Sequence, residues 1–314
     1  MALDLKELSK KRDLLSPGHR ACSGCGSVLA IRQVMMAVEG PVVIGFATGC
    51  MEVITTIYPY TAWRVPYIHN AFENVAATIS GVETAYRAAK KQGKIAEEIK
   101  FIAFGGDGGT YDIGLQSLSG AVERGHDFLY VCYNNEAYMN TGIQRSSSTP
   151  FGAATSTCPV GDVHAGKSHY PKDMTAIMAA HDIPYAAQAS PHNWRDLVGK
   201  VKKALAIRGP KFINITASCF RGWRVPPHLS VEVNRLAVES CFWPLYEVEN
   251  GEWKLNYKPK QKLPITEFFK IQGRFSHLLE ECNRGLLEKA QAFVDRKWER
   301  LLARTGDKVH KVLA

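Results

Sequence analysis

The stretch that decides the fold spans residues 100–125 and reads KFIAFGGDGGTYDIGLQSLSGAVERG. It opens with an apolar run, Lys100–Phe104, which is typical of a buried strand. The run stops at two glycines, and Tyr111–Arg124 then has helical spacing up to Gly125. The stretch therefore predicts a strand, a glycine-rich turn and a helix, which is one unit of a parallel α/β sheet.

Further units of the same kind lie on both sides of this stretch. The other predicted strands are Val42–Ala47, Phe128–Tyr133, Tyr185–Ala189 and Phe212–Ala217, and the other predicted helices are Asn70–Lys91, Lys172–His181 and Asn193–Ile207. This alternation predicts an α/β fold with a parallel sheet covered by helices. Ligands of such sheets bind at the carboxyl ends of the strands. The segment Thr141–Lys167 is rich in Ser, Thr, Gly and Pro, and we expect it to form a long loop near that edge.

The character of the chain changes after residue 227. We predict one domain over residues 1–227 and a largely helical C-terminal extension over residues 228–314. The extension is expected to hold a helix near Ser230–Ser240, an irregular stretch up to about Pro264 and a charged helix over Arg274–Arg304.

Composition narrows the class of protein. The chain has 314 residues, of which 46% are hydrophobic and 22% charged, as in ordinary globular proteins. Its net charge is +9, but Lys and Arg form no tract of five or more, which argues against a nucleic-acid partner. No signal peptide or long apolar run is visible, so we expect no membrane span and a cytoplasmic location. Eight cysteines in a reducing compartment favour metal or cluster ligation over disulfides.

Two polar motifs follow neighbouring predicted strands. Gly106-Asp107-Gly108 follows the first, and Asn134-Asn135 follows the second after 25 intervening residues, 109 through 133. Asp107 offers a hard anionic oxygen to Mg²⁺, and Asn135 offers a neutral amide oxygen. The glycines let the backbone approach a diphosphate, at which the next helix points its N–H groups. The spacing resembles the thiamine diphosphate signature, although two unrelated turns after strands remain the alternative.

The cysteines suggest a second cofactor. Cys22 and Cys25 form a C-x-x-C pair, whereas Cys50 and Cys219 are single and follow predicted strands. Four thiolates can close a zinc site or hold a 4Fe–4S cluster. One pair plus two single cysteines favours the cluster, and the alternative is one redox or zinc pair with buried cysteines elsewhere. Of the remaining cysteines, we expect a core position for Cys132, structural roles for Cys241 and Cys282, and leave Cys158 unassigned.

Four motifs together carry a close resemblance to a known family. They are GHRACSGCG at 18–26, ATGCMEV at 47–53, GGDGGTYDIG at 105–114 and NNEAYMNTG at 134–142. Over roughly residues 15–250 the chain resembles the β subunits of the 2-oxoacid:ferredoxin oxidoreductases, most closely those that act on pyruvate. That family includes a branch that oxidises oxalate. The resemblance implies a thiamine diphosphate-binding fold of the pyrophosphate type with Mg²⁺ and one 4Fe–4S cluster.

The resemblance also assigns roles to particular residues. It makes Cys22, Cys25, Cys50 and Cys219 the cluster ligands, and it makes Asp107, Asn135 and the Ala137 carbonyl the ligands of Mg²⁺. The residues expected to bind thiamine diphosphate are Thr48, Gly49, Val53, Gly106, Asp107, Gly108, Asn135, Asn140 and Thr141. Asn140 would face the substrate as a catalytic residue, and Thr141–Gln144 would line the entrance. His69 is a second catalytic candidate, although a surface or core histidine is an equally good interpretation.

The activity implied is oxidative decarboxylation of a small 2-oxo acid such as pyruvate, or of oxalate. CO₂ is released and electrons pass singly through the cluster to ferredoxin. Arg221 and Arg224 lie next to the fourth cysteine and leave the identity of the substrate undecided. They are either surface charges or groups that tune the cluster potential or favour an acidic substrate. The alternatives are a non-redox thiamine diphosphate lyase or synthase with a structural metal site, and a zinc-stabilised scaffold protein.

The resemblance implies partner subunits as well. Thiamine catalysis requires a carboxylate beside the aminopyrimidine ring, and the family places it on a separate pyrimidine-binding domain. Glu52, Glu73 and Glu136 lie inside the diphosphate-side motifs, so none of them is a good candidate. We therefore expect an α-type subunit with the pyrimidine-binding domain, a ferredoxin-like subunit with further 4Fe–4S clusters, and an external ferredoxin.

Overall fold

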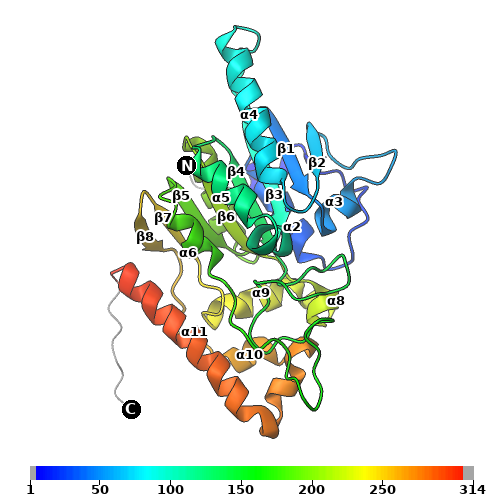
Figure 1. Cartoon of the computed structure of the whole chain (residues 1–314), viewed down its shortest axis with the longest axis vertical. Helices are drawn as coiled ribbons and strands as arrows, with labels where there is room; N and C mark the ends of the chain where they lie inside the picture. Colours follow the sequence, from blue (N-terminus) through cyan, green and yellow to red (C-terminus); the bar gives the residue numbers. More distant parts are fainter. Residues whose placement is uncertain (1–4, 307–314) are drawn as a thin grey trace.

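The computed structural model describes residues 5–306, and these residues form one mixed sheet between layers of helices (Figure 1). The eight strands in the described residues are β1 (Val42–Ala47), β2 (Tyr67–Asn70), β3 (Lys100–Gly106), β4 (Leu129–Asn134), β5 (Tyr185–Ala189), β6 (Lys211–Thr216), β7 (Tyr246–Glu249) and β8 (Glu252–Leu255). Their order across the sheet is β2-β1-β3-β4-β6-β5-β7-β8. The first six are parallel to one another, and β7 and β8 join antiparallel.

The parallel arrangement follows from the apolar strands. In β4, β5 and β6 every residue is buried, and such strands are typical of sheets covered by helices on both faces. Parallel neighbours need long crossover connections, which the helices between the strands supply. The prediction of a helix-covered parallel sheet is confirmed.

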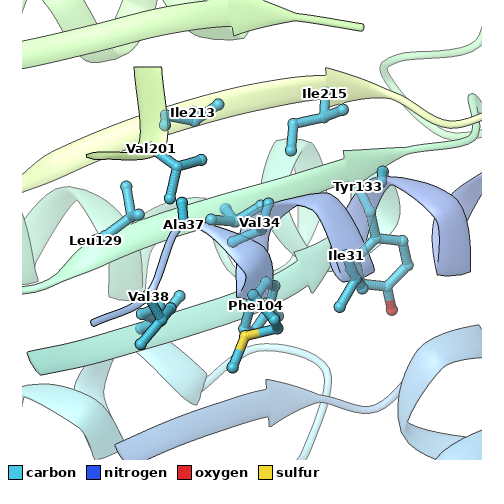
Figure 2. Packing of buried hydrophobic residues seen from close by; sticks show 14 of the residues in the cluster. Ile31, Val34, Ala37, Val38, Phe104, Leu129, Tyr133, Val201, Ile213 and Ile215 are labelled. Atoms are coloured by element: carbon cyan, nitrogen blue, oxygen red, sulfur yellow. The ribbon is translucent and has the colours of Figure 1, made fainter. Parts of the chain in front are cut away.

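Two layers of helices cover the sheet. The helices are α1 (Leu5–Ser9), α2 (Gly26–Met36), α3 (Cys50–Thr55), α4 (Val75–Lys91), α5 (Leu115–Glu123), α6 (Met174–Ala179), α7 (Trp194–Ala206), α8 (Phe220–Trp223), α9 (Ser230–Glu239), α10 (Ile265–Phe269) and α11 (Arg284–Arg304), with short turns η1 (Gly108–Asp112), η2 (Pro227–Leu229), η3 (Gly273–Leu279) and η4 (Glu281–Asn283). On one face α2 and α7 pack in a single apolar cluster, part of which Figure 2 shows with Ile31 and Val34 of α2 beside the sheet. The other face is packed against α4, α5 and α6.

The C-terminal residues form a third cluster and also extend the sheet. Helices α9, α10 and α11 bury their apolar side chains together with Trp223, and Figure 1 shows α11 running along the opposite end of the molecule from α4. The stretch up to about Pro264 was expected to be irregular, which is wrong, because β7 and β8 lie within it. They are joined at Asn250-Gly251, where both residues have positive φ, as a tight hairpin requires. This Asn-Gly pair is a strong hairpin signal, but it was not among the predicted turns.

Several helix boundaries also differ from the predictions. The helix expected from Asn70 begins at Val75, because Tyr67–Asn70 forms β2 and pairs with β1 at the sheet edge. The helix expected from Tyr111 is divided into the wide turn η1 and then α5. The charged helix expected from Arg274 begins at Arg284, since η3 and η4 precede it. Helix α2, which starts directly after Cys25, was not predicted.

No helix among residues 5–306 is both long enough and apolar enough to cross a membrane. The cytoplasmic location and the division of the chain at residue 227 stay predictions.

Candidate active site at the carboxyl edge of the sheet

The predicted functional residues meet at one edge of the sheet. Strands β1, β3, β4 and β6 are consecutive neighbours, and the segments holding Cys50, Asp107, Asn135 and Cys219 follow their carboxyl ends. A pocket opens at this edge. Its lining residues are Thr48, Gly49, Cys50, Phe72, Gly106, Asp107, Gly108, Gly109, Tyr133, Asn135, Ala137, Tyr138, Met139, Asn140 and Thr141. The structure therefore has a cavity at the ends of these strands, where we expect ligands to bind.

Asp107 lies at the floor of this pocket and is fully buried. Its Oδ2 accepts a hydrogen bond from the Ser146 hydroxyl at 2.5 Å, and its Oδ1 accepts one from the Asn135 backbone N–H at 3.3 Å. The pKa of Asp107 is raised to about 7, mainly by burial and also by the charge of Glu136, whereas these hydrogen bonds oppose the rise. A carboxylate held dry in this way favours a cation that would compensate its charge.

Three polar groups converge beside Asp107 Oδ1. One end of the Asn135 side-chain amide lies 2.9 Å from Asp107 Oδ1 and 2.8 Å from the Ala137 carbonyl oxygen. With the amide nitrogen there, it donates to both oxygens. With the amide oxygen there, three oxygens face one another, and a cation between them would compensate their repulsion. Carboxylate, amide and backbone carbonyl oxygens are the donor set that Mg²⁺ prefers, so these residues fit the predicted metal.

The glycines of the motif let two segments approach closely. A β-carbon on Gly108 would stand 2.3 Å from the ring of Tyr138, and the Tyr138 hydroxyl donates to the Gly108 carbonyl at 3.0 Å. Residue 108 must therefore lack a side chain for the loop after β4 to close over η1. This brings the Asn135 loop against the backbone that follows Asp107.

The four cysteines predicted as ligands come from three segments that meet beside this pocket. Cys22 lies in an N-terminal loop, Cys25 precedes α2, Cys50 begins α3 and Cys219 precedes α8. The Gly26 N–H donates to the Ser218 carbonyl at 3.0 Å, which holds Cys25 next to Cys219 along the backbone. A β-carbon on Gly26 would stand 2.6 Å from Ser218, so this contact depends on the glycine.

The thiols are close enough to affect one another. Burial raises the pKa of Cys25, of Cys219 and of Cys50, the last to about 12. Charge on the neighbouring cysteines raises each pKa further, and for Cys50 these neighbours are the other three. Within residues 5–306, no three His, Cys, Asp or Glu side chains are gathered around a single ion position.

Some predicted residues lie at or beyond the mouth of the pocket. Asn140 and Thr141 are exposed and line its opening. His69 does not line it; its Nε2 lies 3.0 Å from Thr48 Oγ1 and 3.6 Å from a carboxylate oxygen of Glu52. Val53 is 41% exposed on α3, outside the pocket. The roles given to these four residues stay predictions.

The structure adds residues that sequence reasoning missed. Ser146 bonds to Asp107 across 39 positions, and Phe72, Tyr133, Tyr138 and Met139 line the pocket. The expected loop Thr141–Lys167 does fold back on the site, but no local pattern marks Ser146 within it. Cys132 is buried in β4 as expected, whereas Cys158 is partly exposed in the loop.

Comparison with known proteins gives the family. Residues 47–215 match the family described as "Thiamine pyrophosphate enzyme, C-terminal TPP binding domain". The chain is 55% identical over 303 residues to pyruvate synthase subunit PorB of Thermotoga maritima, covering 95% of this chain and 94% of that protein. It is 53% identical over 289 residues to the PorB subunit of Methanocaldococcus jannaschii, covering 91% and 96%.

The chain belongs to the β subunits of the 2-oxoacid:ferredoxin oxidoreductases. It is also 46% identical to ketoisovalerate oxidoreductase subunit VorB of Pyrococcus abyssi, with 90% of this chain and 91% of that one covered. A solved 2-oxoglutarate:ferredoxin oxidoreductase from Magnetococcus marinus has the same fold, with a TM-score of 0.54 and 20% identity over 71% of this chain and 79% of that chain. The predicted family, thiamine diphosphate-binding fold and enzyme class are confirmed.

Proposed function

We propose that this chain is the β subunit that binds thiamine diphosphate, Mg²⁺ and one 4Fe–4S cluster in an enzyme that oxidatively decarboxylates pyruvate. The observation that carries the proposal is the convergence of Asp107, Asn135 and Ala137 on one point, with the Cys50 segment lining the same pocket. The relatives named pyruvate synthase subunits support pyruvate as the substrate, and the ketoisovalerate relative makes a branched 2-oxo acid the next candidate.

Asp107, Asn135 and Ala137 would hold Mg²⁺, and the metal would compensate the diphosphate charge beside the buried carboxylate. The Ser146 hydroxyl occupies Asp107 Oδ2, so the cation would bind at Oδ1, which also accepts the Asn135 backbone N–H. Ser146 is therefore a positioning residue for the carboxylate, in the way that outer hydrogen bonds orient metal ligands.

The backbone around Gly108 would face the diphosphate. The turn η1 begins there, and its N–H groups point back toward the Asp107 end of the strand, where an anion is favoured. Thiamine diphosphate supplies the carbanion chemistry that removes CO₂ from a 2-oxo acid. This chain contributes orientation, a dry pocket floor and, at its mouth, the Asn140 amide, which would donate a hydrogen bond to the substrate oxygen.

Cys22, Cys25, Cys50 and Cys219 would hold the 4Fe–4S cluster and provide the electron exit. They come from three segments, charge on neighbouring cysteines raises the pKa of Cys25, Cys50 and Cys219, and Cys50 also lines the cofactor pocket. A cluster at this position would be adjacent to the site of decarboxylation, which suits transfer of electrons one at a time.

The site is incomplete without partners. Glu136 is paired with Arg274 at 2.6 Å, and Glu52 accepts from Thr56, so both carboxylates are engaged inside this chain. We propose that an α-type subunit supplies the carboxylate for the aminopyrimidine ring and closes the pocket. A ferredoxin-like subunit with further clusters would then carry electrons to an external ferredoxin.

The test is turnover by the assembled complex. We expect a brown protein that reduces a viologen dye with pyruvate, measured against 2-oxoisovalerate, 2-oxoglutarate and oxalate as rival substrates. The chain alone, with its cluster reconstituted, should show no comparable turnover until the partner subunits are added. A colourless complex that converts 2-oxo acids without reducing the dye would support the non-redox thiamine alternative instead.

A further inference from the structure

Tyr133 has a buried hydroxyl that hydrogen-bonds to nothing in the described chain. The residue lies in β4 and is only 1% exposed, and its hydroxyl is one of five buried side-chain polar atoms without a partner among residues 5–306. Burying a hydroxyl without a partner is unfavourable, since its hydrogen bonds to water are lost. Such an atom calls for a group that binds next to it.

The fold directs this hydroxyl toward the cysteine side of the pocket. Leu129, Val131 and Tyr133 alternate along β4 onto the face covered by α2, and Figure 2 shows Tyr133 beside Ile31 of that helix. A β-carbon on Gly49 would stand 2.7 Å from the Tyr133 hydroxyl. The side chain therefore extends to the residue that immediately precedes Cys50.

Cys50 is the acceptor that the geometry favours. The Tyr133 oxygen faces the backbone N–H of Met51 without reaching hydrogen-bond geometry, so the hydroxyl lies beside the first turn of α3. A phenol hydroxyl can donate as well as accept, and this one has no acceptor for its proton among residues 5–306. A neutral thiol is a weak acceptor, whereas a thiolate is a strong one.

We propose that the Tyr133 hydroxyl donates a hydrogen bond to the Cys50 sulfur once that sulfur is a ligand of the cluster. The inference rests on the proposed function. It makes Tyr133 a positioning residue that raises the reduction potential of the cluster, because hydrogen bonds to the sulfurs stabilise the more negative, reduced state. It also explains why Tyr133 lies unpartnered between the cofactor pocket and Cys50.

The test compares two hydroxyl deletions on the same strand. Tyr133→Phe keeps the ring and removes the donor, and we expect the midpoint potential of the cluster, titrated with electron paramagnetic resonance in the complete complex, to become more negative. Iron content should match the wild type, and Mg²⁺-dependent thiamine diphosphate affinity is measured alongside. The control is Tyr130→Phe, whose buried hydroxyl lies on the other face and bonds to Thr110 at 3.1 Å. It should lower thermal stability and leave the potential unchanged.

Each result decides the inference. An unchanged potential in Tyr133→Phe overturns it, and so does an equal shift in Tyr130→Phe. An unchanged potential with weakened thiamine diphosphate binding would assign the hydroxyl to that cofactor instead. A wild-type complex with no iron–sulfur signal would overturn the proposed function and this inference together, whereas a normal wild-type signal with no shift overturns this inference alone.

Discussion

The Asp107 end of the pocket and the four-cysteine site are neighbours, yet they are held in different ways. Around Asp107, side chains fix the loops: Asn134 accepts from the Ser148 hydroxyl at 2.7 Å, and Thr149 donates to the Glu136 carbonyl at 2.7 Å. The cysteine segments are joined mainly through backbone contacts, and Cys22 is exposed. We therefore expect the first region to be formed before Mg²⁺ and thiamine diphosphate bind, and the second to be completed only by the proposed cluster.

The Asn135 loop also carries strain that its neighbours offset. Glu136 has a φ of 66°, which is unfavourable for a residue with a side chain. Its N–H donates to the Asn134 side chain at 3.0 Å, and its carboxylate is paired with Arg274 from the C-terminal extension. Arg274 lies over the ring of Trp223, whose indole N–H donates to the Asn135 carbonyl at 2.8 Å. The extension thus helps to hold the predicted metal loop.

The largest effect is expected at the cysteines. Replacing any one of Cys22, Cys25, Cys50 or Cys219 by Ala should abolish the cluster. The variant lacks one of the four proposed ligands, and the backbone contacts between these segments cannot take the place of that ligand. Iron and sulfide content and visible absorbance of the purified protein measure this. Cys158→Ala is the control and should keep the full cluster content. Full content in the Cys219 variant with loss in the Cys158 variant would overturn the assignment.

The next effect is on stability. Arg274→Met leaves the buried Glu136 carboxylate without its partner, and we expect a loss of about 3–5 kcal/mol. The double variant Glu136→Gln with Arg274→Met removes both charges and should lose less. Thermal unfolding of the complex measures both. If the single variant is no less stable than the double, the pair does not hold the loop as described.

At the metal site the expected effects are graded. Asp107→Ala should weaken Mg²⁺-dependent thiamine diphosphate binding by at least about 100-fold, or ~2.7 kcal/mol, since a ligand is lost. Ser146→Ala removes only the hydrogen bond that orients the carboxylate, and we expect a loss of roughly tenfold. Calorimetric titration distinguishes them. Equal affinities in Asp107→Ala and the wild type would contradict the motif assignment.

The smallest effect is on pH dependence. The folded-state pKa of Asp107 is raised to about 7 from 3.8, so the folded protein holds a proton there that the unfolded chain has released. Without metal, this residue's contribution therefore lowers stability as pH rises from about 4 to 7. Mg²⁺ competes with the proton, so Mg²⁺ affinity should rise about fivefold from pH 6 to pH 7, about twofold more up to pH 8, and then level off. A flat profile over pH 5–8 would show that Asp107 is already ionised in the empty site.

Local sequence is a good guide where a segment's own residues dictate its structure. Val42–Ala47 and Tyr185–Ala189 form strands with the predicted bounds, because apolar runs of that length are buried in any parallel sheet. The start of α4 was misplaced, since Tyr67–Asn70 becomes a strand only by pairing with β1. The Asn250-Gly251 pair is typical of a tight hairpin turn, so the local sequence also carried the pattern for the β7–β8 hairpin, which was not predicted.

By itself, the sequence determined the alternation of strands and helices, the glycine-rich turn at Asp107 and the motifs that identify a thiamine diphosphate-binding fold. These features depend on short-range geometry and on residue type. Only the tertiary structure decided that Ser146 bonds to Asp107, that Arg274 reaches Glu136 and that Tyr133 points at Gly49. Those contacts join residues 39, 138 and 84 positions apart. They arise from sheet order and loop closure, which no local pattern specifies.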